Sequence, residues 1–271
     1  MERLPGQHLY RIWDGLLLDH KKAVLDQIAA VLNQMAMLKF DEIGSLQEDG
    51  LGPFIHLCLP TNKEGTYKST LDFLCAFIDE KSVESLELKT LYGQIKETLE
   101  NFFTSPADAS YFHPPFRLIH PDFDAQNLLF VKPADNSEAR PCLSGVIDFE
   151  YAHTGPLYYL YEYPIFIQDV DFSPELYEEN AVLRPYFARA LRQGFPKGSP
   201  DAIAARNAMR DKTFILNEFK RVFTSMKMPE SIMEIQAATF LQQLEEGTGH
   251  AYTGRPDYVP DPELWSDDEE T

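Results

Sequence analysis

The segment from Leu118 to Phe130 constrains the fold of this chain most strongly, because it places a polar loop between two apolar runs. Short apolar runs bounded by turn-forming residues are typical of buried strands. Between these runs the loop begins His120-Pro121-Asp122 and ends at Asn127, which gives the pattern H-x-D-x-x-x-x-N. The sequence therefore predicts two short strands joined by a loop that gathers several polar side chains.

A second apolar run, Gly145-Val146-Ile147, ends in a carboxylate at Asp148 and continues through Phe149 to Glu150. We expect strands near residues 117–119, 128–131 and 144–147, with the polar segment 132–141 as a hairpin loop. An Asp and an Asn in one loop, with a further Asp at the end of a nearby strand, can position a hydroxyl group and hold Mg²⁺ against a nucleotide phosphate.

Helices are expected around this small β element. Apolar residues recur at helical spacing, and the expected helices cover residues 19–38, 69–78, 85–103, 199 to about 226, and 231–244. Ser199-Pro200-Asp201 supplies a capping serine, a proline at the first helical position and an acid in the first turn. The proline-rich acidic segment 253–271 is expected to be an irregular, partly disordered tail. The predicted fold class is α+β, mainly α, with a folded domain over residues 1–252.

The charge of the chain restricts its partners. A formal net charge of −19 disfavours nucleic acid and anionic membrane surfaces, because both are bound through basic patches. The sequence contains no apolar run of membrane-spanning length, no apolar signal core near the N-terminus and no C-x-x-C spacing among its three cysteines. We therefore expect a soluble protein of the cytoplasm.

The candidate site residues have distinct expected roles. Asp122 is the candidate base for an acceptor hydroxyl, and the oxygens of Asn127 and Asp148 are candidate Mg²⁺ ligands. His120 is expected to orient the loop by hydrogen bonding to the backbone. Asp124 and Glu150 are open between a supporting role, a substrate contact and a solvated charge. A carboxylate such as that of Asp148 can also be a simple turn or helix cap.

Tyrosines follow the metal-ligand candidate closely, at Tyr151, Tyr158, Tyr159, Tyr161 and Tyr163. Such rings can stack on a sugar or surround a cation. A packed core segment is the commoner explanation of an aromatic run, so both interpretations stay open.

At these residues the chain resembles the aminoglycoside phosphotransferase family, which is related to choline kinases and shares the protein-kinase-like fold. The family's catalytic loop reads roughly H-G-D-x-x-x-x-N and its metal strand V-I-D-W/F-E. The resemblance implies that Asp122 and His120 are catalytic, that Asn127 and Asp148 bind Mg²⁺ and the nucleotide, and that ATP or GTP is the phosphate donor. It also implies a small hydroxylated substrate, for which an amine-bearing alcohol is a candidate.

The beginning of the chain adds to the resemblance. Residues 4–38 are similar to the part of the family that follows the hinge between its two lobes, so residues 1–252 resemble the helical C-terminal lobe. The family's phosphate-covering loop, strand lysine and helix glutamate have no counterpart, since no lysine precedes Lys21. The segment Gly155-Pro156-Leu157 also lacks the aspartates of the family's G-D-P-x-x-D-L motif. The expected protein is an N-terminally truncated form of a small-molecule kinase.

Three functional interpretations remain open. The first is that truncated kinase, whose 271 residues alone are weakly active or inactive. The second is a one-lobed pseudokinase that acts as a binding or scaffold protein and self-associates through an exposed interlobe face. The third is a different phosphate chemistry, such as hydrolysis, and it has the least support because no cation is evident to offset the phosphate charge.

Overall fold

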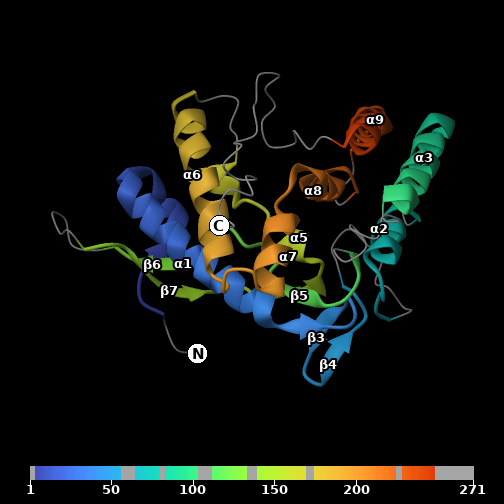
Figure 1. The fold of residues 1–271 in the computed structure, drawn as a ribbon. Helices are drawn as coiled ribbons and strands as arrows, with labels where there is room; N and C mark the ends of the chain where they lie inside the picture. Colours follow the sequence, from blue (N-terminus) through green and yellow to red (C-terminus); the bar gives the residue numbers. More distant parts are fainter. Residues whose placement is uncertain are drawn as a thin grey trace.

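The computed structural model describes residues 4–55, 65–79, 83–102, 112–132, 139–168, 174–223 and 228–247. Within these ranges helices surround two small antiparallel sheets (Figure 1). The predicted fold class, α+β and mainly α, is confirmed. The expected tail over residues 253–271 lies outside the described residues.

The helices are α1 (Leu18–Met37), α2 (Thr70–Asp79), α3 (Leu86–Phe102), α5 (Leu157–Leu160), α6 (Pro174–Gln193), α7 (Pro200–Ala208), α8 (Asp211–Phe223) and α9 (Glu230–Glu246). The strands are β1 (Gln7–His8), β2 (Lys39–Phe40), β3 (Ser45–Gln47), β4 (Gly50–Gly52), β5 (Phe116–Ile119), β6 (Leu128–Val131), β7 (Cys142–Val146) and β8 (His153–Gly155). No helix in the described part of the chain combines the length and the apolarity that crossing a membrane requires.

Helix boundaries follow the capping signals in the sequence. At the start of α7, the Oγ of Ser199 accepts a hydrogen bond of 3.2 Å from the backbone N–H of Ala202. At the end of α9, Gly247 adopts the left-handed conformation with a φ of 68°, which glycine reaches without steric cost. The predicted helices near residues 19–38, 69–78, 85–103 and 231–244 are confirmed as α1, α2, α3 and α9.

The prediction of one helix from Ser199 to about residue 226 is wrong. The chain turns after α7 and begins α8 at Asp211, and the hydroxyl of Thr213 donates a hydrogen bond of 2.8 Å to the carbonyl of Asn207 across this turn. α5 contacts both helices, but α7 also packs against α6, whereas α8 packs against α2 and α9. A single straight helix cannot make both sets of contacts, so the packing of the core breaks it.

Helix α6 was not predicted from the sequence. Leu183, Phe187 and Leu191 recur every four residues and are fully buried, and α6 packs alongside α1 (Figure 1). Pro185 lies inside the helix, where proline is normally disfavoured. The apolar spacing was the available signal, and the internal proline weakened it.

The β structure is larger than the predicted three-strand element. A three-stranded sheet has the order β1-β6-β7, and a five-stranded sheet has the order β2-β5-β8-β3-β4. The predicted β6–β7 hairpin is present, but β5 belongs to the other sheet. The loop over residues 120–127 therefore passes from one sheet to the other, and both sheets fix its ends.

One aromatic cluster joins the first and last parts of the chain. Phe77 on α2 contacts Phe73 and the ring of Phe219 on α8, with centroid distances of 5.1 and 6.0 Å. Phe219 in turn contacts Phe240 on α9 at 5.9 Å. All four rings are buried in one hydrophobic core, so α2, α8 and α9 form a single packed unit.

Candidate active site

His120 connects the two segments that carry the candidate site residues. Its Nε2 lies 2.9 Å from the carbonyl oxygen of Ile147, and the backbone nitrogen of Asp122 lies 3.2 Å from its Nδ1. Because a backbone N–H can only donate, Nδ1 accepts, and the neutral ring then donates Nε2–H to Ile147. His120 therefore fixes the Asp122 loop against the residue that precedes Asp148.

Asp122 has one anchored carboxylate oxygen. Its Oδ2 accepts hydrogen bonds of 2.7 Å from Nε2 of Gln126 and 2.9 Å from Nδ2 of Asn127. No hydrogen-bond donor reaches Oδ1 from the described residues, and the side chain is exposed. The carboxylate is thus held in a fixed orientation with one oxygen available to a ligand.

Asn127 and Asp148 flank the same end of the β6–β7 hairpin. Leu128 pairs with Val146, and the next backbone hydrogen bond, 3.0 Å long, runs from the nitrogen of Ile147 to the carbonyl of Asn127. The side chain of Asn127 uses Nδ2 for both of its hydrogen bonds, to the carboxylate and to the carbonyl oxygen of Asp122. Within the described ranges no hydrogen-bond donor contacts its Oδ1, so this oxygen can coordinate a metal ion.

The loop that presents Asp148 has an unusual backbone. Asp148 has a φ of 66° and Tyr151 a φ of 60°, so both are in the left-handed region. Aspartate tolerates this conformation better than most residues, whereas for a bulky tyrosine it is an outlier. A hydrogen bond of 3.0 Å from the nitrogen of Ala152 to the carbonyl of Phe149 closes the loop. Such outliers persist where the surrounding structure fixes them, and they concentrate at functional sites.

A cavity of 390 Å³ opens beside Asp122. Its polar walls include His120 and three acidic side chains, those of Asp122, Asp124 and Glu162. Its other lining residues are Leu32, Ile119, Pro121, Phe123, Tyr159, Leu160, Tyr163, Pro164, Ile165 and Gln168. Burial raises the pKa of the Asp124 carboxyl, and the nearby charge of Asp122 adds to this shift, while a hydrogen bond from the backbone of Ala125 opposes it.

The structure separates the predicted site residues into two groups. Asp122, His120 and Asp124 line the cavity, whereas Asn127, Asp148 and Glu150 are not among its lining residues. Glu150 is exposed in the loop after Asp148 and makes no hydrogen bond or ion pair with the described residues. Of the five tyrosines considered, Tyr159 and Tyr163 line the cavity.

Two contributors were missed at the sequence level. Gln126 bonds directly to the Asp122 carboxylate, and Glu162 contributes an acidic wall from a segment beyond the tyrosine run. The polar Gln126 beside Asn127 gave no signal of its own, because loops are commonly polar. A single acid within the aromatic sequence Tyr161-Glu162-Tyr163 was a usable signal, since a carboxylate is costly to bury in a packed core.

The oxygen atoms at the hairpin end suit a magnesium ion. Mg²⁺ prefers oxygen ligands and commonly keeps several waters, binding through one or two protein groups plus substrate phosphates. The Asp148 carboxylate and Oδ1 of Asn127 provide two such oxygens. Across the described residues there is no group of three or more His, Cys, Asp or Glu side chains arranged to hold a metal. The donor set therefore fits a metal that shares its coordination sphere with a nucleotide.

Lys21, the first lysine of the chain, takes part in the packing of two helices. It is buried on α1, forms an ion pair with Glu179 on α6 and lies 5.3 Å from the centroid of the Trp13 ring. The ion pair between Lys21 and Glu179 therefore links α1 to α6.

A comparison with known protein families identifies the family of the chain. A family model described as the phosphotransferase enzyme family, APH, matches residues 1–159. This match covers more than half of the 271 residues, so the chain belongs to this family of phosphoryl-transferring enzymes. The matched part contains the Asp122 loop, the β6–β7 hairpin and Asp148. No curated protein matches the chain.

Proposed function

We propose that this protein is an ATP- or GTP-dependent, Mg²⁺-dependent phosphotransferase that acts on a hydroxyl group of a small molecule. The observation that carries the proposal is the Asp122 carboxylate, which is anchored through Oδ2 and presents Oδ1 beside a cavity. Membership of the phosphotransferase enzyme family supports the reaction class.

The proposed chemistry uses Asp122 as the base. The acceptor hydroxyl lies in the cavity against Oδ1, and its oxygen attacks the terminal phosphorus of the nucleotide. As the new P–O bond forms, the bond to the departing nucleoside diphosphate breaks and the hydroxyl proton passes to Asp122. Asn127 and Asp148 would hold Mg²⁺, which when bound neutralises charge on the phosphate oxygens. His120, buried below the loop, keeps these residues in place.

The cavity favours an amine-bearing alcohol as the acceptor. Asp122, Asp124 and Glu162 give it three acidic side chains, and Tyr159 and Tyr163 add aromatic rings. Carboxylates attract an ammonium group, and aromatic faces attract it further. The volume of 390 Å³ lies in the range of about 300–1,000 Å³ that is usual for small-molecule sites.

Titration calorimetry of Mg·ATP into the 271-residue chain tests the nucleotide site. We expect saturable binding that is lost in Asp148→Asn, a variant that removes the charge but keeps the side-chain shape. Glu150→Gln is the matched control, because it removes a neighbouring exposed carboxylate for which we propose no metal contact. Equal binding by the wild type and Asp148→Asn would reject Asp148 as a metal ligand. Absence of binding to the wild type would leave two interpretations, the truncated kinase and the one-lobed pseudokinase.

Transfer is then measured as nucleoside diphosphate release with a panel of alcohols, with and without an amine. We expect Asp122→Asn to lower kcat by roughly 10²–10⁴-fold with a small change in KM, since a positioned base acts in the transition state. Neutral alcohols that perform as well as amines would reject the proposed acceptor class. A normal kcat in Asp122→Asn would remove Asp122 from the mechanism.

A further inference from the structure

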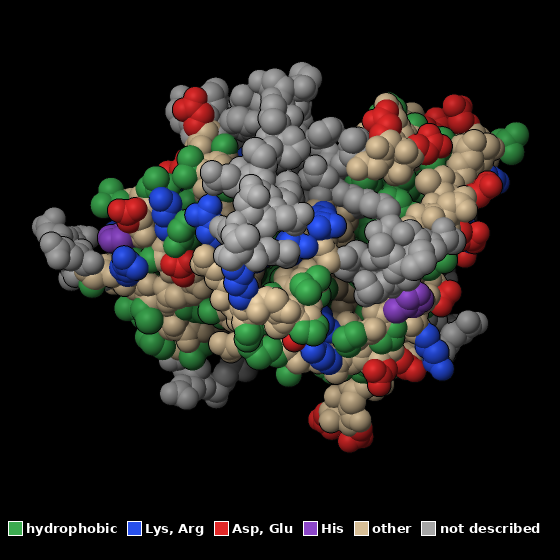
Figure 2. All heavy atoms as spheres, in the orientation of Figure 1, with side chains coloured by type: hydrophobic (Ala, Val, Ile, Leu, Met, Phe, Trp, Pro, Cys, Tyr) green, Lys and Arg blue, Asp and Glu red, His purple; other side chains and the backbone are tan. Residues whose placement is uncertain are grey.

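A second cavity lies at the opposite end of β5 from the Asp122 loop. Its volume is 200 Å³, and its lining includes Lys39, His113, Arg117 and a single carboxylate, that of Asp201. None of these residues lines the cavity beside Asp122. In a chain with a net charge of −19, this is a local concentration of positive charge. Figure 2 shows the wider contrast, with Lys and Arg near the middle of the face and acidic side chains towards the α3 and α9 end.

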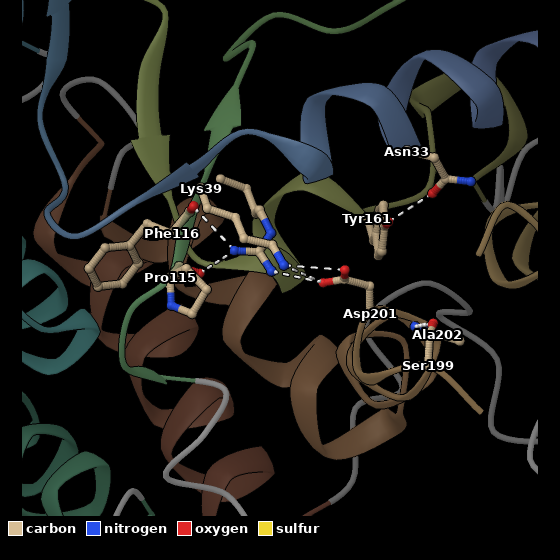
Figure 3. Close-up of polar contacts among 9 residues, drawn as sticks. Asn33, Lys39, Pro115, Phe116, Tyr161, Ser199, Asp201 and Ala202 are labelled. Atoms are coloured by element: carbon tan, nitrogen blue, oxygen red, sulfur yellow. Dashed lines mark hydrogen bonds and ion pairs between the residues drawn. The ribbon is translucent and has the colours of Figure 1, made fainter. Parts of the chain in front are cut away.

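Arg117 is the central group of this cavity. It is 4% exposed, and its Nη1 donates hydrogen bonds to the carbonyl oxygens of Pro115 at 2.6 Å and Phe116 at 3.3 Å (Figure 3). Its Nη2 lies 3.6 Å from Oδ1 of Asp201, which is too long for a good hydrogen bond, and its Nε has no partner within the described structure. The buried guanidinium therefore has fewer acceptors than donors.

Burial without full pairing is costly for a charged group. Burial lowers the pKa of the Arg117 guanidinium, and the nearby charge of Asp201 opposes this shift. An anion that enters the cavity and accepts from Nη2 would complete the pairing. A further hydrogen-bond acceptor beside the Arg117 guanidinium would therefore be favourable.

Asp201 does not supply that acceptor, because it also serves Lys39. The Nζ of Lys39 lies 3.1 Å from Oδ1 and 3.2 Å from Oδ2 of Asp201, so both carboxylate oxygens face the lysine (Figure 3). Two cationic side chains, those of Lys39 and Arg117, therefore share one carboxylate. The side chain of Lys39 is 48% exposed, so it can turn towards a ligand without a change in the backbone.

The N-terminus of α7 also favours an anion in this cavity. Pro200 and Asp201, its first residues, line the cavity, so the positive end of the helix dipole lies beside it. Helix N-termini are recurrent sites of phosphate binding. This contribution is smaller than that of Arg117, and the Asp201 carboxylate partly offsets it.

We propose that this cavity binds a phosphate group, either as inorganic phosphate or as the phosphate of a small ester. Arg117 is the principal donor through Nη2, and Lys39 and His113 complete the site. A phosphate offers several acceptor oxygens and up to two negative charges, which match two cations and a histidine. The volume of 200 Å³ is below the usual range of about 300–1,000 Å³ for drug-sized ligands, so a small anion fits best. The site is independent of the proposed transfer reaction.

Titration calorimetry of inorganic phosphate into the full chain, at fixed ionic strength and without nucleotide or Mg²⁺, tests the site. We expect saturable binding that Lys39→Met weakens by about tenfold, while Lys68→Met has no effect. Lys68 is a matched control because its side chain is 80% exposed and lies 4.0 Å from an acid, Glu42. The half-exposed Lys39 is the better target, since loss of the buried Arg117 would also disturb folding.

Asp201→Asn provides a second measurement with the opposite sign. Removal of the resident carboxylate should strengthen phosphate binding by about threefold or more, although it removes the ion pairs that link α7 to β2 and β5. If these residues were a purely structural ion-pair network, the variant would lose stability and gain no affinity. A phosphate site therefore predicts a gain in affinity, whereas a purely structural network predicts none.

Three results would overturn the proposal. They are the absence of saturable binding by both the wild type and Asp201→Asn up to about 10 mM phosphate, an equal loss in Lys68→Met, and a loss in Asp148→Asn, which would place the anion at the candidate active site. A parallel titration with glycerol 3-phosphate shows whether the cavity prefers inorganic phosphate or a phosphate ester. Tighter binding of the ester indicates a phosphorylated small molecule, and weaker or equal binding indicates free phosphate.

Discussion

Asp148 combines a candidate metal ligand with a left-handed backbone, and this affects how it should be tested. At a φ of 66°, alanine costs about 1 kcal/mol, whereas asparagine tolerates the conformation as aspartate does. We predict that Asp148→Asn and Asp148→Ala both lose Mg·ATP binding, but that Asp148→Ala also lowers the free energy of unfolding by about 1 kcal/mol. Urea denaturation measures the difference, and equal stabilities of the two variants would contradict it.

Gln126 is expected to position the base. Its hydrogen bond of 2.7 Å anchors Oδ2 of Asp122, and its side chain is exposed. We predict that Gln126→Leu lowers kcat by about tenfold through misorientation of the carboxylate, with the free energy of unfolding unchanged within about 0.5 kcal/mol. Gln242→Leu is the control, since Gln242 is exposed on α9 and bonds to Glu246. A parallel fall in stability and kcat would indicate a structural role for Gln126.

Asp124 should make stability depend on pH. Because its pKa is raised in the folded protein, the folded state retains this proton when the unfolded state has lost it. Stability contributed by Asp124 is therefore present below the unfolded pKa of about 3.9 and is lost as pH rises through the folded value. We predict that Asp124→Asn is more stable than the wild type at pH 7 and that this gain disappears in acid. A gain independent of pH, in chemical denaturation at several pH values, would contradict the electrostatic cause.

At the residue scale, spacing along the chain predicted the grouping of His120, Asp122 and Asn127, because one short loop holds all three. It could not predict that Gln126 would share the Asp122 carboxylate, since that contact depends on the conformation of the loop. Glu162 stood out as a single acid within an aromatic sequence, but its place in the cavity depends on the path of the chain after α5, which the local sequence does not encode.

Two glycines, one inside α3 and one directly after α9, give opposite expectations for stability. Apart from the chain neighbours and the helix's own backbone, an added methyl group meets no atom of the described residues within 4 Å at either Gly93 or Gly247, so contacts with the surroundings do not distinguish the two. Gly93 lies inside α3 and should gain about 0.5–1 kcal/mol of unfolding free energy as alanine. Gly247 has a φ of 68°, so alanine there should cost about 1 kcal/mol.

Thermal or urea denaturation of the two alanine variants checks this pair. Each variant serves as the control for the other, since the chemical change is identical. Changes of the same sign would show that backbone conformation does not decide the outcome.

Among the elements, long amphipathic helices such as α1 and α3 were predictable because one face is apolar at regular spacing. The division between α7 and α8 was not, because tertiary packing causes it rather than a glycine or proline. The shortest strands, β1 and β2, have two residues each and carry no periodic pattern. Their existence depends on partners far along the chain, so local sequence cannot indicate them.

The part matched by the family is not expected to fold alone. A fragment of residues 1–159 lacks α6, α8 and α9, which pack against α1, α2 and α3. Its Phe77 would lose the buried contact with Phe219. We predict that this fragment is largely unfolded or aggregated, whereas residues 1–252 unfold in one cooperative transition, as a single domain does. Circular dichroism during urea denaturation measures both, and cooperative unfolding of the fragment would contradict the single-domain organisation.

The strand pairing has a consequence for how the protein acquires its structure. Gln7 pairs with Phe130, Lys39 with Arg117 and Ser45 with His153, so β1 and β2 find their partners only after a long intervening segment, and the local β3–β4 hairpin joins the rest of its sheet in the same way. Such a high contact order slows folding, because a long loop must close before the contact stabilises it. During synthesis on the ribosome, β1 and β2 would wait unpaired until residues 130 and 117 have emerged, and the β3–β4 hairpin would gain its contact with β8 only after residue 153. The supports of the Asp122 loop are therefore completed late, and helix α1, which forms through local contacts, is expected to precede them.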